Sequence, residues 1–133
     1  MFTNDKILNL EAIKECIIDY SSPIFIIGDI DLNVKESTVI DANTPKENLI
    51  IMGREPAWVR KVFNNRNKEE NILIIKNFDD LNLDRQALFM DIIRYNKVSS
   101  IDLPNNLKII INAKKKTKIH PRIFEMIQIF NLE

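Results

Sequence analysis

Short, unbroken runs of aliphatic residues constrain this chain more than any other feature of its sequence. They occur at 24–27, 72–75 and 109–111, and each stops well short of the roughly 18–20 apolar residues that span a bilayer. Such runs are typical of strands buried on both faces, as in a parallel sheet. The segments between them carry apolar residues at helical spacing, for example Leu88, Ile92 and Phe89, Ile93. The sequence therefore predicts strands that alternate with amphipathic helices.

The expected elements define an α/β fold. We predict a three-layer sandwich, with a mostly parallel sheet of about five strands and helices on both faces. Residues 1–133 form a single domain in this interpretation, and 49–52 fit either a short strand or a packed loop. Helices are expected at 5–20, 56–63, 84–95 and from 121, and strands at 24–27, 37–42, 72–75, 107–111 and 127–130.

Composition excludes several classes of protein. The 133 residues are 45% hydrophobic and 29% charged, which fits one folded domain and not a disordered chain. Nineteen basic and nineteen acidic residues give a net charge of zero, which argues against a whole-protein nucleic-acid surface but leaves a local patch open. A single cysteine and a single histidine exclude a disulfide framework and a zinc site of several cysteines. With no signal-peptide pattern at the start, we expect a soluble, cytoplasmic protein without a membrane partner.

Glycine is unusually scarce. The chain has two, Gly28 and Gly53, and they are far apart. Loops that cradle phosphates need closely spaced glycines so that backbone N–H groups can approach the anion. The sequence therefore excludes both a standard dinucleotide fingerprint and a P-loop.

The second half of the chain resembles the core of an AAA+ ATPase, a P-loop NTPase fold. The stretch from Ile72 to Leu81 resembles the Walker B strand and the connection that follows it. The resemblance assigns 24–28 to the strand that normally precedes the P-loop and 38–42 to the next strand. It also assigns 83–88 to the following helix, 101–110 to the approach to the sensor 1 strand, 119–124 to the segment before the arginine finger, and 127–130 to the last core strand.

The departures from the AAA+ pattern fall on the residues that handle ATP. The Walker B acids, which hold Mg²⁺ and polarise the attacking water, are replaced by Lys76 and Asn77. The sensor 1 residue falls on Asn112 or Lys114, and the arginine finger falls near Met126. The sequence ends where the helical lid would begin. The resemblance thus implies a core that lacks the P-loop, the Walker B acids, the arginine finger and the lid, with no cofactor, no bound metal and no catalytic residue.

The leading functional hypothesis is a non-catalytic AAA+-like module, a pseudo-ATPase that serves protein interaction or assembly. AAA+ cores assemble through broad flanks of the sheet and helices, and the loss of nucleotide chemistry leaves those surfaces intact. The partner is then another protein or a second copy of the chain. This interpretation leans against an enzyme, and the phosphotransfer alternative below leaves that question open.

Two alternatives belong to other classes. A small nucleic-acid-binding protein would use the lysine cluster at 114–118, whose candidate contacts are Lys114, Lys115, Lys116, Lys118 and Arg122, although a solvated loop explains the same residues. A metal-dependent phosphotransfer enzyme would use Asp29 and Asp31, which follow the first strand where α/β sheets place their ligand crevice. The plain interpretation of these aspartates is that they cap loop N–H groups.

Three further residues are interpreted as structural. Trp58 lies on the apolar face of its expected helix and is assigned to the core. His120 stands at the start of a helix, and no nucleophile or orienting partner can be named for it. Cys16 lies on the apolar side of the first expected helix and is interpreted as an inert buried thiol.

Overall fold

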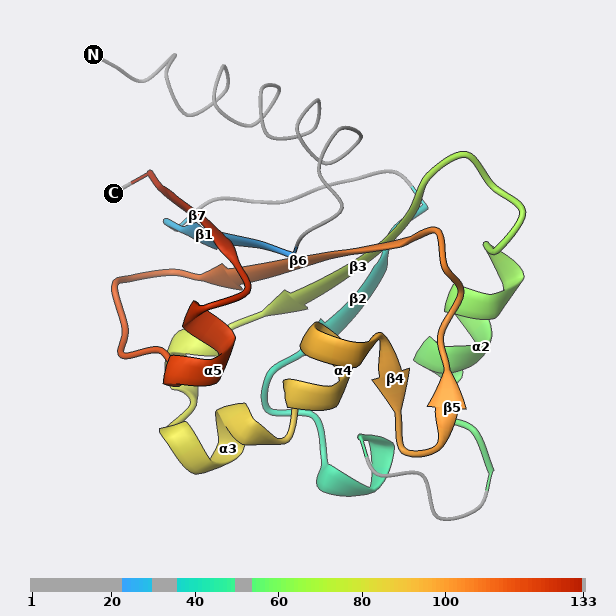
Figure 1. The fold of residues 1–133 in the computed structure, drawn as a ribbon, viewed down its shortest axis with the longest axis horizontal. Coiled ribbons are helices and arrows are strands. Elements are labelled where there is room, and N and C mark those ends of the chain that lie inside the picture. The colour runs from blue at the N-terminus through green and yellow to red at the C-terminus, as the bar shows by residue number, and fades with distance from the viewer. Residues whose placement is uncertain (1–22, 30–35, 50–53, 133) are drawn as a thin grey trace.

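A five-stranded parallel sheet forms the centre of the computed structural model, which describes residues 23–29, 36–49 and 54–132 (Figure 1). Across the sheet, the strands are β2 (Thr38–Asp41), β3 (Asn71–Lys76), β6 (Leu107–Ala113), β1 (Ile24–Ile27) and β7 (Gln128–Asn131). Every neighbouring pair in this sheet is parallel. The predicted α/β class, with a mostly parallel sheet of about five strands, is confirmed.

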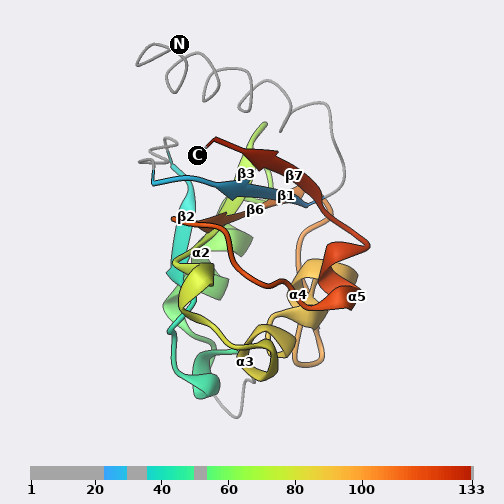
Figure 2. The ribbon, with the colours of Figure 1, turned by 90° about the vertical axis from the view of Figure 1, so that its left-hand side faces the viewer.

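The described helices lie together on one face of the sheet (Figure 2). They are α2 (Ala57–Asn64), α3 (Leu83–Ala87), α4 (Met90–Tyr95) and α5 (Pro121–Phe124), with the short 3₁₀ turns η1 (Lys46–Asn48) and η2 (Phe78–Asp80). The helix expected at 5–20 lies outside the described residues, as do residues 50–52 of the ambiguous segment. Of the three expected layers, the described part of the chain therefore supplies the sheet and one helical layer.

Both faces of the sheet are buried, as the continuous apolar runs predict. Phe25 and Ile27 of β1 point into the core between the sheet and its helices. Ile24 and Ile26 alternate with them and join a second buried cluster on the other face, together with Ile72, Ile74 and Ile110. This alternation follows from the two-residue period of a strand.

Phe78 lies at the centre of the helix-side core. Its side chain is fully buried, and its ring makes edge contacts with Phe25 at 5.7 Å and with Phe89 at 5.9 Å between centroids. The residue before it, Asn77, has a left-handed backbone with φ of 63°. This conformation, which asparagine tolerates better than most residues, follows the last residue of β3 and precedes the turn that carries Phe78.

The structure confirms the predicted core position of Trp58 in α2 and corrects the predicted helix at 84–95. In α2, Trp58 is buried and its Nε1–H donates to the carbonyl of Asn48 at 3.1 Å, so its assignment to the core is confirmed. The single helix expected at 84–95 is wrong, because the chain forms α3 and α4 with a turn at 88–89 between them. The cap of α3 is Asn82, whose side chain accepts from the Arg85 N–H at 2.9 Å, and not Asp84.

A β-hairpin follows α4 where the sequence analysis expected only a turn. It pairs β4 (Lys97–Val98) with β5 (Ile101–Asp102) in an antiparallel ladder. Strands of two residues are too short to show an alternating pattern. The hairpin depends instead on the left-handed backbone of Asn96 and Ser99, both with φ of 55°.

Candidate functional site at the carboxyl edge of the sheet

The order of the strands marks one edge of the sheet as the place for a ligand. The chain leaves β1 toward β2, across β6 and β3, whereas it leaves β6 in the opposite direction, past β1, to reach β7. Neighbouring strands whose connections leave in opposite directions form the topological switch point of an open α/β sheet, and ligands bind at its carboxyl edge. The residues that end β1, β2, β3 and β6 therefore define the candidate site.

At the ends of β1 and β6, a buried asparagine joins the two strands. Asn112 is 6% exposed, and its side-chain amide donates to the carbonyls of Ile26 at 3.0 Å and Gly28 at 3.3 Å. The N–H of Gly28 donates to the carbonyl of Ala113 at 2.8 Å, and its φ of 154° is accessible to glycine at little cost. The side chain of Asn112, one of the two positions that the resemblance offers for sensor 1, is thus engaged with the backbone at the end of β1.

At the ends of β2 and β3, a carboxylate is held by amides. Asp41 accepts from the Asn77 side chain at 2.7 Å and from the Asn43 N–H at 2.8 Å. The Asn43 side chain also donates to Asp80 at 3.1 Å. Lys76, which the resemblance places at the first Walker B position, is exposed beside this network. Asn77, which it places at the second, donates to Asp41 and is therefore not a free water-polarising group.

These partners change the acidity of Asp41. Burial alone would raise its pKa, but hydrogen bonds from the Asn43 N–H and the Asn77 and Asn43 side chains, with the charge of Lys76, outweigh burial. The pKa of Asp41 in the folded chain therefore lies below its usual value. The ionised carboxylate stabilises the fold above the unfolded pKa, near 3.9, and this contribution is lost as the pH falls through the folded pKa.

We expect Asp41→Asn to reduce stability at neutral pH by about 1 kcal/mol, because the charged acceptor is lost. The difference from the native chain should shrink as the pH falls below the ordinary pKa of an aspartate and through the lowered pKa of Asp41. Urea unfolding at several pH values measures both. The exposed Asp91→Asn serves as the matched control. A difference that stays constant with pH would contradict this account of Asp41.

The loop that carries the lysine cluster is tethered at both ends. At its start, the Lys114 N–H donates to the Asp79 carboxylate at 3.0 Å. At its end, the fully buried Gln86 donates to the carbonyl of Lys118 at 2.8 Å and accepts from the His120 N–H at 2.7 Å. These contacts use the loop backbone and none of the lysine side chains.

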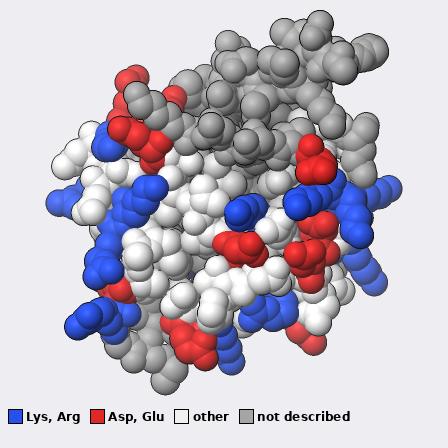
Figure 3. Space-filling model, turned by 180° about the vertical axis from the view of Figure 1, so that it is seen from behind, with Lys and Arg blue, Asp and Glu red and all other residues white. Residues whose placement is uncertain are grey.

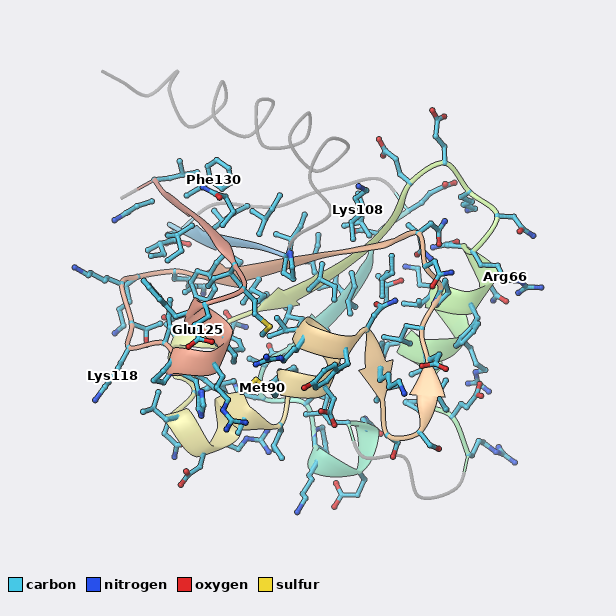
Figure 4. The ribbon with its side chains drawn as sticks, viewed as in Figure 1. Arg66, Met90, Lys108, Lys118, Glu125 and Phe130 are labelled. Atoms are coloured by element: carbon cyan, nitrogen blue, oxygen red, sulfur yellow. The ribbon has the colours of Figure 1, made fainter. Side chains whose placement is uncertain are left out.

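The structure brings the predicted nucleic-acid contacts together on this loop and on the helix that follows it. Lys118 projects away from the body of the molecule (Figure 4). Within the described part of the chain, ion pairs join Lys68 to Glu36 and Lys97 to Asp102, and none involves a cation of this loop or Arg122. The five exposed cations are Lys114, Lys115, Lys116, Lys118 and Arg122. The face opposite to that of Figure 1 nevertheless carries both signs of charge side by side (Figure 3).

Few of the carboxylates near the carboxyl edge of the sheet are free to bind a metal ion. Asp29 is exposed directly after β1, and Asp31 lies outside the described residues. Asp79 and Asp80, which follow β3, accept hydrogen bonds from the Lys114 N–H and the Asn43 side chain, respectively. Among the residues that the structure describes, no group of three or more acidic, histidine or cysteine side chains is placed to hold a metal ion.

His120 caps α5. Its Nδ1 accepts from the N–H of Arg122 at 3.2 Å, and Pro121 occupies the first helical turn. This arrangement agrees with the interpretation of His120 as a residue at the start of a helix.

Sequence reasoning missed the residues that hold the edge together. The predicted strand at 37–42 includes Asp41, although an aspartate at a strand end can accept from the backbone N–H two residues on and so form an Asx turn. Gln86 carries no local signal, because its partners Lys118 and His120 are distant in sequence.

No protein-family model matches the chain, and no curated protein matches it closely enough to count as a relative. No helix in the described ranges has the length and apolar character needed to cross a membrane.

Proposed function

We propose that this chain is a non-catalytic, AAA+-like module for protein interaction or assembly. One observation carries the proposal: two side chains at positions that the resemblance assigns to ATP chemistry, Asn77 and one of the two sensor 1 candidates, Asn112, are engaged inside the chain. Asn77 donates to Asp41, and Asn112 donates to the backbone of β1. Side chains that are committed to holding strand ends together are poorly suited to bind Mg²⁺ and orient water.

The strand order supports the AAA+-like part of the proposal. The resemblance assigns β1, β2, β3, β6 and β7 to the five core strands in chain order, and β1 lies between the fourth and the fifth of them. AAA+ cores place the strand before the P-loop in this position. The support is at the level of topology, so the function rests on the site and its tests.

Exposed aromatic side chains support the interaction part. Tyr95 of α4 is 59% exposed and Phe124 of α5 is 57% exposed, and the two helices contact each other. Aromatic residues are enriched in protein interfaces because they contribute large contact areas. The proposed partner is another protein or a second copy of this chain, in the cytoplasm.

Calorimetric titration tests the absence of nucleotide chemistry. We expect no ATP binding in the presence of Mg²⁺, because a glycine loop is missing and Lys76 would repel the metal. Mg²⁺ or Mn²⁺ alone should not raise the melting temperature, although a native-state ligand at one hundred times its Kd would stabilise the fold by about 2.7 kcal/mol. Micromolar ATP binding would contradict the proposal. A metal shift abolished by Asp29→Asn would favour phosphotransfer chemistry instead.

Assembly itself is tested in two ways. Sedimentation velocity at micromolar concentrations shows whether the chain associates with itself. Affinity purification from the native cell identifies a partner, and the complex is then rebuilt from purified components. A chain that stays monomeric and forms no rebuilt complex would refute the proposed role.

A second candidate function is nucleic-acid binding through the loop at 114–118. The exposure of the cations on this loop favours it. We expect this binding to be weak near physiological salt, because the whole chain is neutral and acids lie nearby. Titrations with DNA, described in the next subsection, measure this binding.

A further inference from the structure

The basic loop, residues 114–118, is presented in a fixed position. Asp79 holds the backbone at one end and Gln86 holds it at the other, through the contacts described above. A loop that is ordered before binding loses less conformational entropy when a partner docks. Its shape therefore favours recognition of a specific partner over a purely solvating role.

The charges of the basic loop are available to a partner. Its lysine side chains are exposed, and in the described ranges no carboxylate pairs with them. Arg122, at the beginning of α5, extends the positive surface. An acidic surface would complement this cluster and would be guided to it electrostatically.

The neighbouring helix adds an apolar anchor. In α5, Ile123 is fully buried, whereas Phe124 is 57% exposed. Aromatic residues and arginine are both enriched in protein interfaces, and α5 exposes one of each, Phe124 and Arg122.

Acids around this surface disfavour a nucleic acid as the partner. Asp79 and Asp80 lie at the start of the basic loop, and the exposed Glu125 follows Phe124. A duplex carries one negative charge per roughly 1.7 Å, so phosphates would have to pass close to these carboxylates. A protein partner can instead place its own carboxylates opposite the lysines of this chain. It can place neutral groups opposite the carboxylates of this chain.

We infer that the basic loop and Phe124 form a docking surface for an acidic segment of a partner protein, a segment that also carries an apolar side chain. The lysines select the negative charge, and Phe124 packs against the apolar group. This inference rests on the proposed role in protein interaction and assigns a surface and a partner chemistry to it.

The test is fluorescence anisotropy with the full chain and a labelled peptide in which glutamate alternates with leucine. One variant changes Lys114, Lys115, Lys116 and Lys118 to glutamine, and a second is Phe124→Ser. A matched control changes to glutamine four exposed basic residues elsewhere that have no ion pair among the described residues, Lys46, Arg54, Arg60 and Lys76. Parallel titrations use single-stranded and duplex DNA across a salt series.

We expect the loop variant to weaken peptide binding roughly tenfold, or about 1.4 kcal/mol, since each exposed ion pair contributes little on its own. The separate variant Phe124→Ser should also weaken peptide binding, and the control variant should bind the peptide like the native chain. DNA binding should be weak at about 0.15 M salt, a physiological ionic strength.

Three results would overturn the inference. The first is peptide binding that the loop variant leaves intact, and the second is no peptide binding at all. The third is submicromolar DNA binding that the loop variant abolishes, with a logarithmic salt slope of roughly −3 to −4 for about four phosphate contacts. Failure of the peptide arm leaves the ATP and assembly experiments unaffected, so the two proposals fail separately.

Discussion

Replacing Phe78 by alanine is expected to lower the free energy of unfolding by about 3–5 kcal/mol, the usual cost of removing a buried phenylalanine. The side chain is fully buried, and its ring lies between those of Phe25 and Phe89. Its removal forfeits both edge contacts and leaves a cavity under the sheet. A loss of this size is a large share of the roughly 5–15 kcal/mol that stabilise an ordinary domain.

Urea denaturation followed by far-UV circular dichroism measures this loss. Phe124→Ala removes the same atoms from an exposed ring and should change stability by no more than about 0.5 kcal/mol. If Phe78→Ala does not fold, Phe78→Leu is compared with the native chain and should be destabilised less. Equal effects of the substitutions at Phe78 and Phe124 would refute the central position of Phe78.

The sheet was predictable because its signal is local. An unbroken apolar run such as Ile72–Ile75 needs no distant information to indicate a strand buried on both faces. The structure extends the run by one residue at each end, to Asn71 and Lys76. Asn71 is buried there because its amide donates to the Val62 carbonyl at 3.0 Å, a partner that lies on another element.

The elements that were missed depend on backbone conformations that the sequence signals only weakly. The hairpin of β4 and β5 requires a left-handed backbone at Asn96 and Ser99. Serine is seldom found in that conformation. The turn at 88–89 interrupts an apolar stripe that is continuous in sequence, so helical periodicity alone predicted one helix across it.

The candidate site divides in the same way. The basic loop was found because a run of lysines between a strand and a helix is visible in the sequence. The hydrogen bonds of Asn77 and Gln86 were not found from the sequence, because they join residues that are far apart along the chain. Asn77 and Asp41 are 36 residues apart, and His120 and Gln86 are 34 residues apart. Such pairings depend on the strand order of the sheet.

The second large loss of stability is expected at Gln86, which links the fold to the proposed docking surface. We expect Gln86→Ala to lower the free energy of unfolding by roughly 2 kcal/mol, because the Lys118 carbonyl and the His120 N–H lose their partner. Both groups are partly buried, so water replaces the lost bonds only in part. Gln128→Ala, at an exposed position, is the matched control and should be nearly neutral.

The same substitution should release one end of the basic loop. Hydrogen exchange at the His120 amide is expected to accelerate in Gln86→Ala, since that N–H no longer has its acceptor. Binding of the acidic peptide should weaken as well, although every lysine and Phe124 remain in place, because the loop must then be ordered during binding. An unchanged exchange rate at His120 would show that Gln86 does not hold the loop. Unchanged peptide affinity with faster exchange would show that the order of the loop does not contribute to docking.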